Sequence, residues 1–335
     1  MDNCQSQKAI SLLNQIDQKI RWYQSSFSKW DVVFFLAKLF SFDQNKTNWS
    51  DVETIIFKVV NFVFSNNNFG IKLKKIGNTN YFKHLVTELF ADQSNKETDL
   101  ANDMLNELKQ FEREFAAFIQ RKETLQYYIN AKNTIESILH VKNTQIILDV
   151  FDFNYSLNHY DAKNYLNLSS KISIHNWTNI HGIADYNKKF NKEKDVKSPK
   201  PIFGFDLHKI LKHPNEKIYN DPRLKFTKSY RLSTNHVNNI WTKDFQKKID
   251  IITIIGHSLS EAGYSYFESI FDKYNLYSGE VILECYYAKR YESEADYTEQ
   301  VDNLLTNYGN TLEGKHGENI FNKLMLEQRL KILPY

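Results

Sequence analysis

The segment 250–271 constrains the fold more than any other part of the chain. It opens with a β-branched run, four isoleucines and one threonine at 251–255, and Gly256 ends that run. A continuous apolar run of this length is typical of a strand that is buried on both faces, as in a parallel sheet. The segment therefore predicts an interior strand followed by a tight turn.

A helix is expected directly after this strand. Ser258 and Glu261 have the spacing of a capping box, and an amphipathic run follows them. In open α/β sheets, ligands bind where parallel strands end and helices begin. Gly256, His257 and Ser258 are therefore candidate ligand-binding residues, together with the amide donors of the helix N-terminus. A simpler interpretation stays open, in which Ser258 only caps the helix and His257 only satisfies a loop carbonyl.

The first 140 residues are expected to be almost entirely helical. Ten glycines and five prolines are few for 335 residues, which favours long helices over many tight turns. The clearest helix has apolar residues at alternating spacings of three and four; it is the segment 98–122. Further helices are predicted at 3–24, at 29–42, from residue 48 or 50 onward, at 79–91 and at 125–138.

The pattern changes near Thr144, where strands begin to alternate with helices, and such alternation favours a parallel sheet. The predicted fold is α/β, with a mainly parallel Rossmann-like sheet. Residues 1–140 are expected to form a mostly helical region packed on a nucleotide-binding-like core at 141–335. The strands of that core are predicted at 145–153, 171–182, 200–206, 251–255 and 281–287, and its last helices at 292–309 and 316–331.

Composition excludes several classes of protein. A net charge of +3 does not indicate nucleic-acid binding, and the lysines of 185–200 are interpreted as a solvated loop. The polar start and the lack of an 18-residue apolar run predict a soluble, cytoplasmic protein without a membrane partner. Two cysteines exclude a disulfide framework, and no histidine pair has metal-site spacing, so no metal is expected.

Three predicted strands end in polar loops, at Asn154, at His181-Gly182 and at Gly256-His257-Ser258. Because the carboxyl ends of parallel strands lie along one edge of a sheet, these loops are expected to converge on one site. The alternative for each histidine is a purely structural role.

GHSLS also approaches the G-x-S-x-G elbow of serine hydrolases, which would make Ser258 a nucleophile. Asp272 or Asp296, with His316, would then complete a triad. Only 77 residues follow Ser258, and they contain one evident strand, which is little sheet for that fold.

DFNYS (152–156), IHG (180–182) and IIGHSLSEAGYSYFESIF (254–271) together resemble the AbiH family of bacterial phage abortive-infection proteins. NWSDVE (48–53) and LNELKQFEREFAAFI (105–119) support the resemblance, which runs from about residue 28 to the C-terminus. It implies a role in phage defence. The family is in turn distantly similar to sirtuin-like NAD-consuming domains.

The sirtuin-like similarity implies a role for each polar loop. Asn154 would contact the substrate, His181 would be catalytic, and Gly256 with Ser258 would bind the nucleotide ribose. NAD is then the candidate substrate, and cleavage of its nicotinamide–ribose bond the implied reaction. Gly182 and His257 lie next to these positions and are also expected to bind the cofactor.

The chain departs from the family pattern at two places. Family members open with a strand and an N-G-F-D loop, whereas this chain has no glycine before Gly70. Either the true start lies upstream, or the nucleotide site lacks one wall. The second departure is Gly263, which stands where the family usually has an acidic residue.

Three functions follow as hypotheses. The first is a phage-defence effector that binds or cleaves NAD, with an unknown phage component as trigger. The second is a non-enzymatic sensor of a phage component, and the third is the serine hydrolase. The sequence leaves homo-oligomerisation open.

Overall fold

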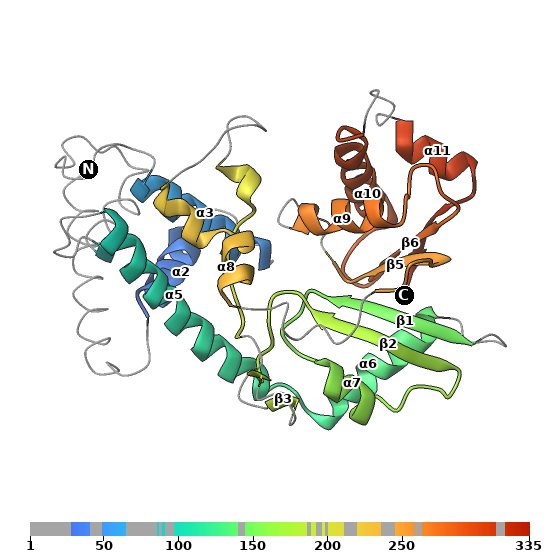
Figure 1. Ribbon diagram of the computed structural model, residues 1–335, viewed down its shortest axis with the longest axis horizontal. Coiled ribbons are helices and arrows are strands. Elements are labelled where there is room, and N and C mark those ends of the chain that lie inside the picture. Colours follow the sequence, from blue (N-terminus) through green and yellow to red (C-terminus); the bar gives the residue numbers. More distant parts are fainter. Residues whose placement is uncertain are drawn as a thin grey trace.

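The structure is a computed structural model with a helical layer on one side and two small parallel sheets on the other (Figure 1). It describes residues 28–40, 49–64, 86, 89–90, 97–139, 145–185, 189–191, 196–197, 200–210, 220–235, 245–257, 259, 263–312 and 319–335. The expected helix at 3–24 lies outside these residues, as does most of the one at 79–91.

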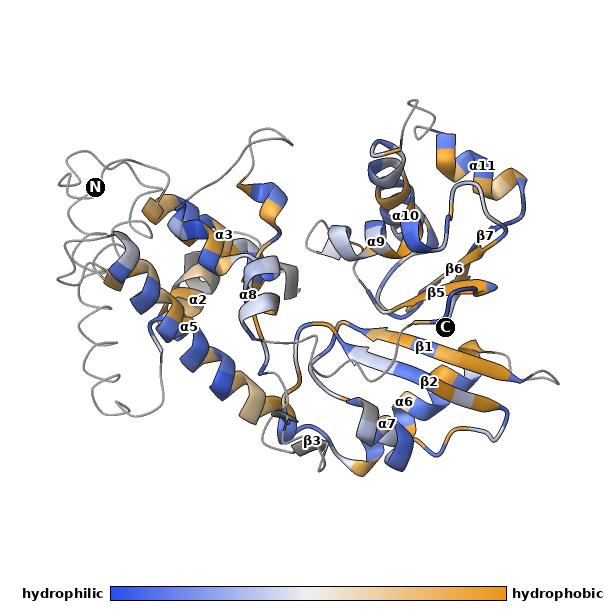
Figure 2. Ribbon diagram, in the orientation of Figure 1, coloured by the Kyte–Doolittle hydropathy of each residue, from blue (hydrophilic) through white to orange (hydrophobic). Residues whose placement is uncertain are grey.

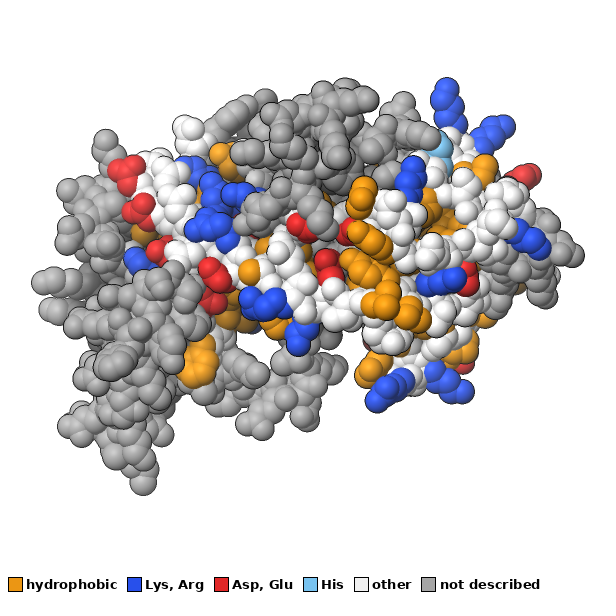
Figure 3. Space-filling model, turned by 90° about the horizontal axis from the view of Figure 1, so that it is seen from below, with side chains coloured by type: hydrophobic (Ala, Val, Ile, Leu, Met, Phe, Trp, Pro, Cys, Tyr) orange, Lys and Arg blue, Asp and Glu red, His pale blue; other side chains and the backbone are white. Residues whose placement is uncertain are grey.

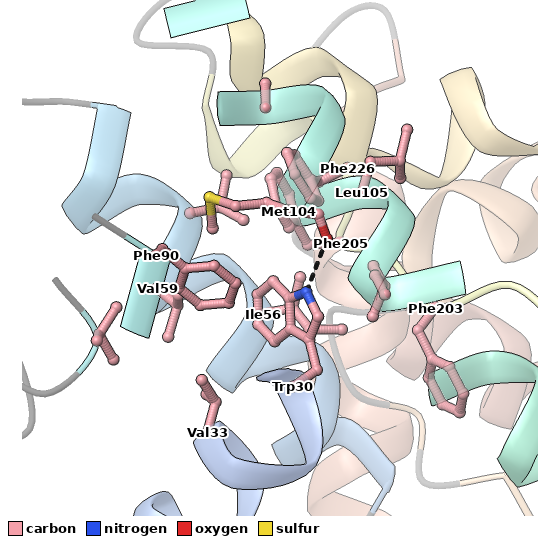
Figure 4. Close-up of a cluster of buried hydrophobic side chains, with 14 of the residues drawn as sticks. Trp30, Val33, Ile56, Val59, Phe90, Met104, Leu105, Phe203, Phe205 and Phe226 are labelled. Atoms are coloured by element: carbon pink, nitrogen blue, oxygen red, sulfur yellow. Dashed lines mark hydrogen bonds between the residues drawn. The ribbon is translucent and has the colours of Figure 1, made fainter. Parts of the chain in front are cut away.

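The helical layer is built around long amphipathic helices. α2 (Lys29–Phe40), α3 (Trp49–Phe64) and α5 (Glu97–Gln120) supply most of its core, in agreement with the predicted periodicity. Figure 4 shows Trp30 among the buried side chains of this core. Its indole nitrogen donates to the Met104 carbonyl at 2.9 Å. Burial of the indole is therefore compatible with its polar N–H.

A later part of the chain completes the helical layer. The short helices η1 (Leu207–Lys209), η2 (Pro222–Phe226) and α8 (Lys228–Thr234) belong to it, and Phe203, Phe205 and Phe226 enter the same core. Hydrophobic packing of this layer thus extends across the division predicted at residue 140.

A buried ion pair joins this later segment to α5. Arg231 forms a bidentate pair with Glu112, in which Nη2 donates to Oε2 at 2.8 Å, and both side chains are buried. The same arginine donates to the Phe203 carbonyl at 2.7 Å, while the Phe203 amide donates to Glu112 at 2.7 Å. Burial raises the pKa of Glu112, and the guanidinium opposes that shift. The guanidinium therefore offsets the cost of burying the Glu112 carboxylate.

The first sheet contains two parallel strands, β1 (Ile146–Asp152) and β2 (Ile172–Asn179). Its register shifts between Leu148 and Asp149. α6 (Leu125–Ile138) and α7 (His159–Tyr165) pack on it through a small core that includes Leu157, Leu166 and Trp177. α6 has the bounds that the sequence predicts, and Thr124 caps it.

The second sheet has three parallel strands in the order β5 (Ile251–Ile255), β6 (Ile282–Tyr287), β7 (Leu330–Pro334). α9 (Tyr264–Lys273), α10 (Glu294–Gly309) and α11 (Ile320–Leu326) supply the helices of its core. Figure 2 shows hydrophobic residues along β1, β5 and β6. β7 was not predicted, and the helix expected at 316–331 overlaps its first residues.

The α/β class and the parallel strands agree with the prediction, but the described strands form separate sheets of two and three strands, and the predicted interior position of β5 was wrong. β5 is an edge strand of its sheet, and Ile251 and Ile255 are 45% and 38% exposed. Gln246 lies against β1 instead, because its amide donates to Asp149 at 2.6 Å and Phe245 stacks on Phe151. The segment before β5 thus contacts β1 through side chains, without strand pairing between the two sheets.

The strand predicted at 200–206 was also wrong. Phe205 forms only an isolated bridge with Thr227, because this segment packs into the helical layer. β3 (Lys189–Asn191) and β4 (Val196–Lys197) are short antiparallel strands within the predicted charged loop.

The face seen from below exposes hydrophobic side chains beside lysines and arginines (Figure 3). Leu125 and Ile129 of α6 are among the exposed large hydrophobic residues. In the part of the chain that the structure describes, no helix is long and apolar enough to span a membrane.

Arg231→Ala should lower the free energy of unfolding by about 3–5 kcal/mol, because Glu112 would remain buried without the cation that offsets its desolvation. Lys323→Ala, which removes a partly exposed pair between Lys323 of α11 and the C-cap residue Glu327, should cost about 0.5 kcal/mol or less. Urea unfolding of both variants measures the difference. Equal, small effects would contradict the role assigned to the buried pair.

Candidate functional site

The phenyl ring of Phe153, directly after β1, connects three of the predicted loops and helices. His181, His257 and Tyr266 all pack edge-on against it, with ring centroids 5.9, 4.5 and 5.6 Å away. Phe267 of α9 stacks on it at 5.6 Å. Phe153 therefore brings the carboxyl ends of β1, β2 and β5 together, although β1 and β5 are not paired.

His181 lies in the turn after β2 and is 6% exposed. Its backbone carbonyl accepts from the Ile202 amide at 3.0 Å, and the Tyr155 hydroxyl donates to the Ile202 carbonyl at 2.9 Å. Burial lowers its pKa well below the usual value, with Lys228 and His257 adding to the shift. The ring is therefore neutral at pH 7.

The hydrogen bonds of His181 define its tautomer. Its ring forms a hydrogen bond with the Phe153 backbone, while the buried Nε2 has no partner among the described residues. The bonded nitrogen is therefore Nδ1, which donates to a carbonyl, and Nε2 presents a lone pair. A buried acceptor without a partner costs about 1–3 kcal/mol, so this atom points to an additional binding partner.

His257 follows β5 and has the complementary tautomer. Its Nδ1 accepts from the Leu259 amide at 3.0 Å, so its proton resides on Nε2. Burial, with a contribution from Lys228, lowers its pKa to about 4. Gly263 leaves room for this ring, because a Cβ there would lie 2.9 Å from its Cε1 atom. This packing explains why an acidic side chain would not fit at that position.

A buried ion pair reaches this cluster from the helical layer. Lys228 of α8 lies 2.9 Å from Glu53 of α3, and both side chains are buried. The lysine charge lowers the pKa of both histidines, which places it near their rings. Burial raises the pKa of Glu53, and Lys228 opposes the shift. The cluster thus contains one cation that a carboxylate already neutralises.

Asn154 belongs to a neighbouring network around Asp152. The backbone N–H of Asn154 donates to Asp152 at 2.8 Å, and the Trp177 and Asn179 side chains donate to the same carboxyl group. Burial raises the pKa of Asp152 to about 7 despite these donors. The Asn154 side chain is exposed and bonds to Asp152. Among the described contacts, Asn154 is therefore not joined to the two histidines.

Gly182 and Gly256 both have positive φ angles, 86° and 60°, which L side chains rarely adopt. Both glycines therefore allow the turns that carry His181 and His257. Ser258 and Glu261 lie outside the described residues. α9 begins only at Tyr264, with Gly263 as its N-cap and no side-chain cap, so the predicted capping box does not start this helix.

The hydrolase triad is not assembled by the described residues. His316 and Ser258 lie outside them. Asp296 accepts from the Ser293 hydroxyl in the N-terminal cap of α10. This contact assigns Asp296 a structural role at the start of α10.

Four residues of this cluster were not predicted as site residues: Phe153, Tyr266, Glu53 and Lys228. Phe153 and Tyr266 were assigned to apolar core patterns, and Glu53 lies inside a helical pattern. Lys228 has no distinguishing sequence signal, since only the packing of the helical layer brings it to the histidines. Phe153, Glu53 and Tyr266 do lie within segments that carry the family resemblance, at 152–156, 48–53 and 254–271, and this was the usable signal.

Comparison with protein-family models, curated proteins and solved structures finds no match for this chain.

His257→Asn should change the pH dependence of stability. A histidine whose pKa falls from 6.5 to about 4 on folding makes the native state less stable as pH drops through that range. Asparagine can still accept from the Leu259 amide but does not titrate. Between pH 7 and 4 the variant should therefore gain up to about 3 kcal/mol relative to wild type. Parallel unfolding curves at these two pH values would contradict burial of a neutral His257.

Proposed function

We propose that this protein is a phage-defence effector that binds a nucleotide, with NAD as the candidate, at the cluster around Phe153. The observation that carries the proposal is the buried, neutral His181, whose Nε2 lone pair has no partner among the described residues. A sugar hydroxyl is a matching donor for such an acceptor. The defence role rests on the resemblance to the AbiH family.

A sirtuin-like arrangement of the core is part of this proposal. In it, the loops after β1, β2 and β5 share one ligand, and the contacts of Phe153 with His181 and His257 support that arrangement. The exposed Asn154 would reach the ligand from the Asp152 network. Gly182, Gly256 and Ser258 would shape the loops around it.

The implied reaction is hydrolysis of NAD. The C1′–N bond breaks, and its electron pair leaves with the nicotinamide ring nitrogen, which loses its positive charge. A water oxygen bonds to C1′ and releases a proton to solvent. A histidine with a strongly lowered pKa is a weak base at pH 7, so His181 would position a ribose hydroxyl instead of accepting a proton.

The lowered pKa values of both histidines favour a second function, a sensor that binds the nucleotide without cleaving it. Both histidines are held neutral by burial, and neither is matched to proton transfer near pH 7. Binding without turnover of NAD by purified protein would favour this function. Loss of NAD in infected cells that carry the protein would favour the enzyme.

His181→Asn tests the proposal. The asparagine amide can still donate to the Phe153 carbonyl, but the Nε2 acceptor is removed. NAD binding should weaken roughly tenfold, about 1.4 kcal/mol, and protection against phage should fall while the melting temperature changes little. Calorimetry, plaque counts and thermal unfolding measure the three effects.

His175→Asn is the matched control. This histidine lies on β2 and pairs with Asp149 at 2.6 Å, with a 30% exposed side chain, so the substitution should leave NAD affinity unchanged. If wild-type protein does not bind NAD, the nucleotide site is wrong. If it binds NAD but phages of several classes still grow normally, only the defence role is wrong.

A further inference from the structure

Two rings of the Phe153 cluster each carry a buried polar atom without a partner in the described part of the chain. Among the described residues, neither His181 Nε2 nor the Tyr266 hydroxyl has a hydrogen-bond partner. Their ring centroids are 5.5 Å apart, and both rings pack edge-on against Phe153. They come from different elements, the turn after β2 and helix α9. One small group between them could therefore contact both.

The two atoms have opposite hydrogen-bonding roles. His181 Nε2 is an acceptor, because the ring donates through its other nitrogen to the Phe153 backbone. Burial raises the pKa of Tyr266, and the carboxylates of Glu53 and Asp206 add to the shift. The Tyr266 hydroxyl therefore stays protonated and can donate a hydrogen bond. A hydroxyl group can donate to one of these atoms and accept from the other.

The surrounding charges argue against an anionic group at this point. The nearby Glu53 and Asp206 carboxylates would repel a phosphate or carboxylate placed at Tyr266. The Lys228 ammonium is already paired with Glu53 at 2.9 Å. A lone pair on neutral His181 repels an anion as well. An uncharged sugar hydroxyl fits these surroundings better than a phosphate does.

We infer that Tyr266 is a specificity-determining residue that, together with His181, binds one ribose hydroxyl of the nucleotide. This inference rests on the proposed function and deepens it. Tyr266 donates a hydrogen bond to the oxygen of this ribose hydroxyl, and the ribose hydroxyl donates a hydrogen bond to His181 Nε2. A ligand that lacks this hydroxyl leaves both protein atoms unpaired, which is how buried polar groups discriminate between substrates.

Tyr266→Phe tests the inference with purified full-length protein. The probes are NAD and two NAD analogues that lack either the 2′- or the 3′-hydroxyl of the nicotinamide ribose. We expect the variant to bind NAD about tenfold more weakly than wild type does. For one of the two analogues, the variant and wild type should have equal affinity, because the hydroxyl that Tyr266 would contact is absent.

Tyr297→Phe is the matched control, because Tyr297 also has a buried hydroxyl without a partner but lies in the core of the second sheet. It should bind all three probes as wild type does. The melting temperature of Tyr266→Phe should equal or exceed that of wild type, since the lost hydroxyl has no hydrogen bond within the described residues.

The outcomes separate the two proposals. If wild type does not bind NAD, the proposed function and this inference both fail. If wild type binds NAD and Tyr266→Phe binds it equally well, only the inference is overturned. A lower melting temperature with the same loss of affinity for all three probes would show that Tyr266 is structural, which also overturns the inference.

Discussion

The aromatic contacts of Phe153 hold together parts of the chain that strand pairing does not join. β1 and β5 belong to separate sheets, yet Phe153 packs on His257 after β5 and on Phe267 of α9. Edge-to-face contacts of this kind add about 0.5–1.5 kcal/mol beyond area burial. Because the same ring also contacts His181, any shift of one sheet against the other would move the two histidines relative to each other.

The helical layer supplies the buried charged residues next to the site. Glu112 and Arg231 fix α8 against α5, and α8 begins with Lys228. That lysine reaches Glu53 of α3 and lies near the histidines. One pair of buried ions therefore positions the next. The cost of burying four charges is offset because each has its ionic partner, and the Glu112–Arg231 pair also hydrogen-bonds to the Phe203 backbone.

Local periodicity predicted single elements well and their assembly poorly. The bounds of α6 and the strand at 251–255 follow from apolar spacing, which depends only on neighbouring residues. The edge position of β5 could not be predicted, because it depends on Gln246 and Phe245 lying against β1. For the site, the loops of His181 and His257 were identified from strand ends. Lys228 and Tyr266 reach the cluster through tertiary packing, which leaves no local pattern in the sequence.

Both histidines are neutral for the same reason, burial beside a lysine, yet their backbone contacts give them opposite roles. The Phe153 backbone leaves an acceptor on His181, whereas the Leu259 amide leaves a donor on His257. Together with the Tyr266 hydroxyl, the cluster offers one acceptor and two donors without net charge from the rings. Such a set is suited to recognising the hydroxyl groups of a sugar, and it is poorly suited to proton transfer near pH 7. Catalysis at this cluster would therefore depend on orienting a bound ribose, with the proton leaving through solvent.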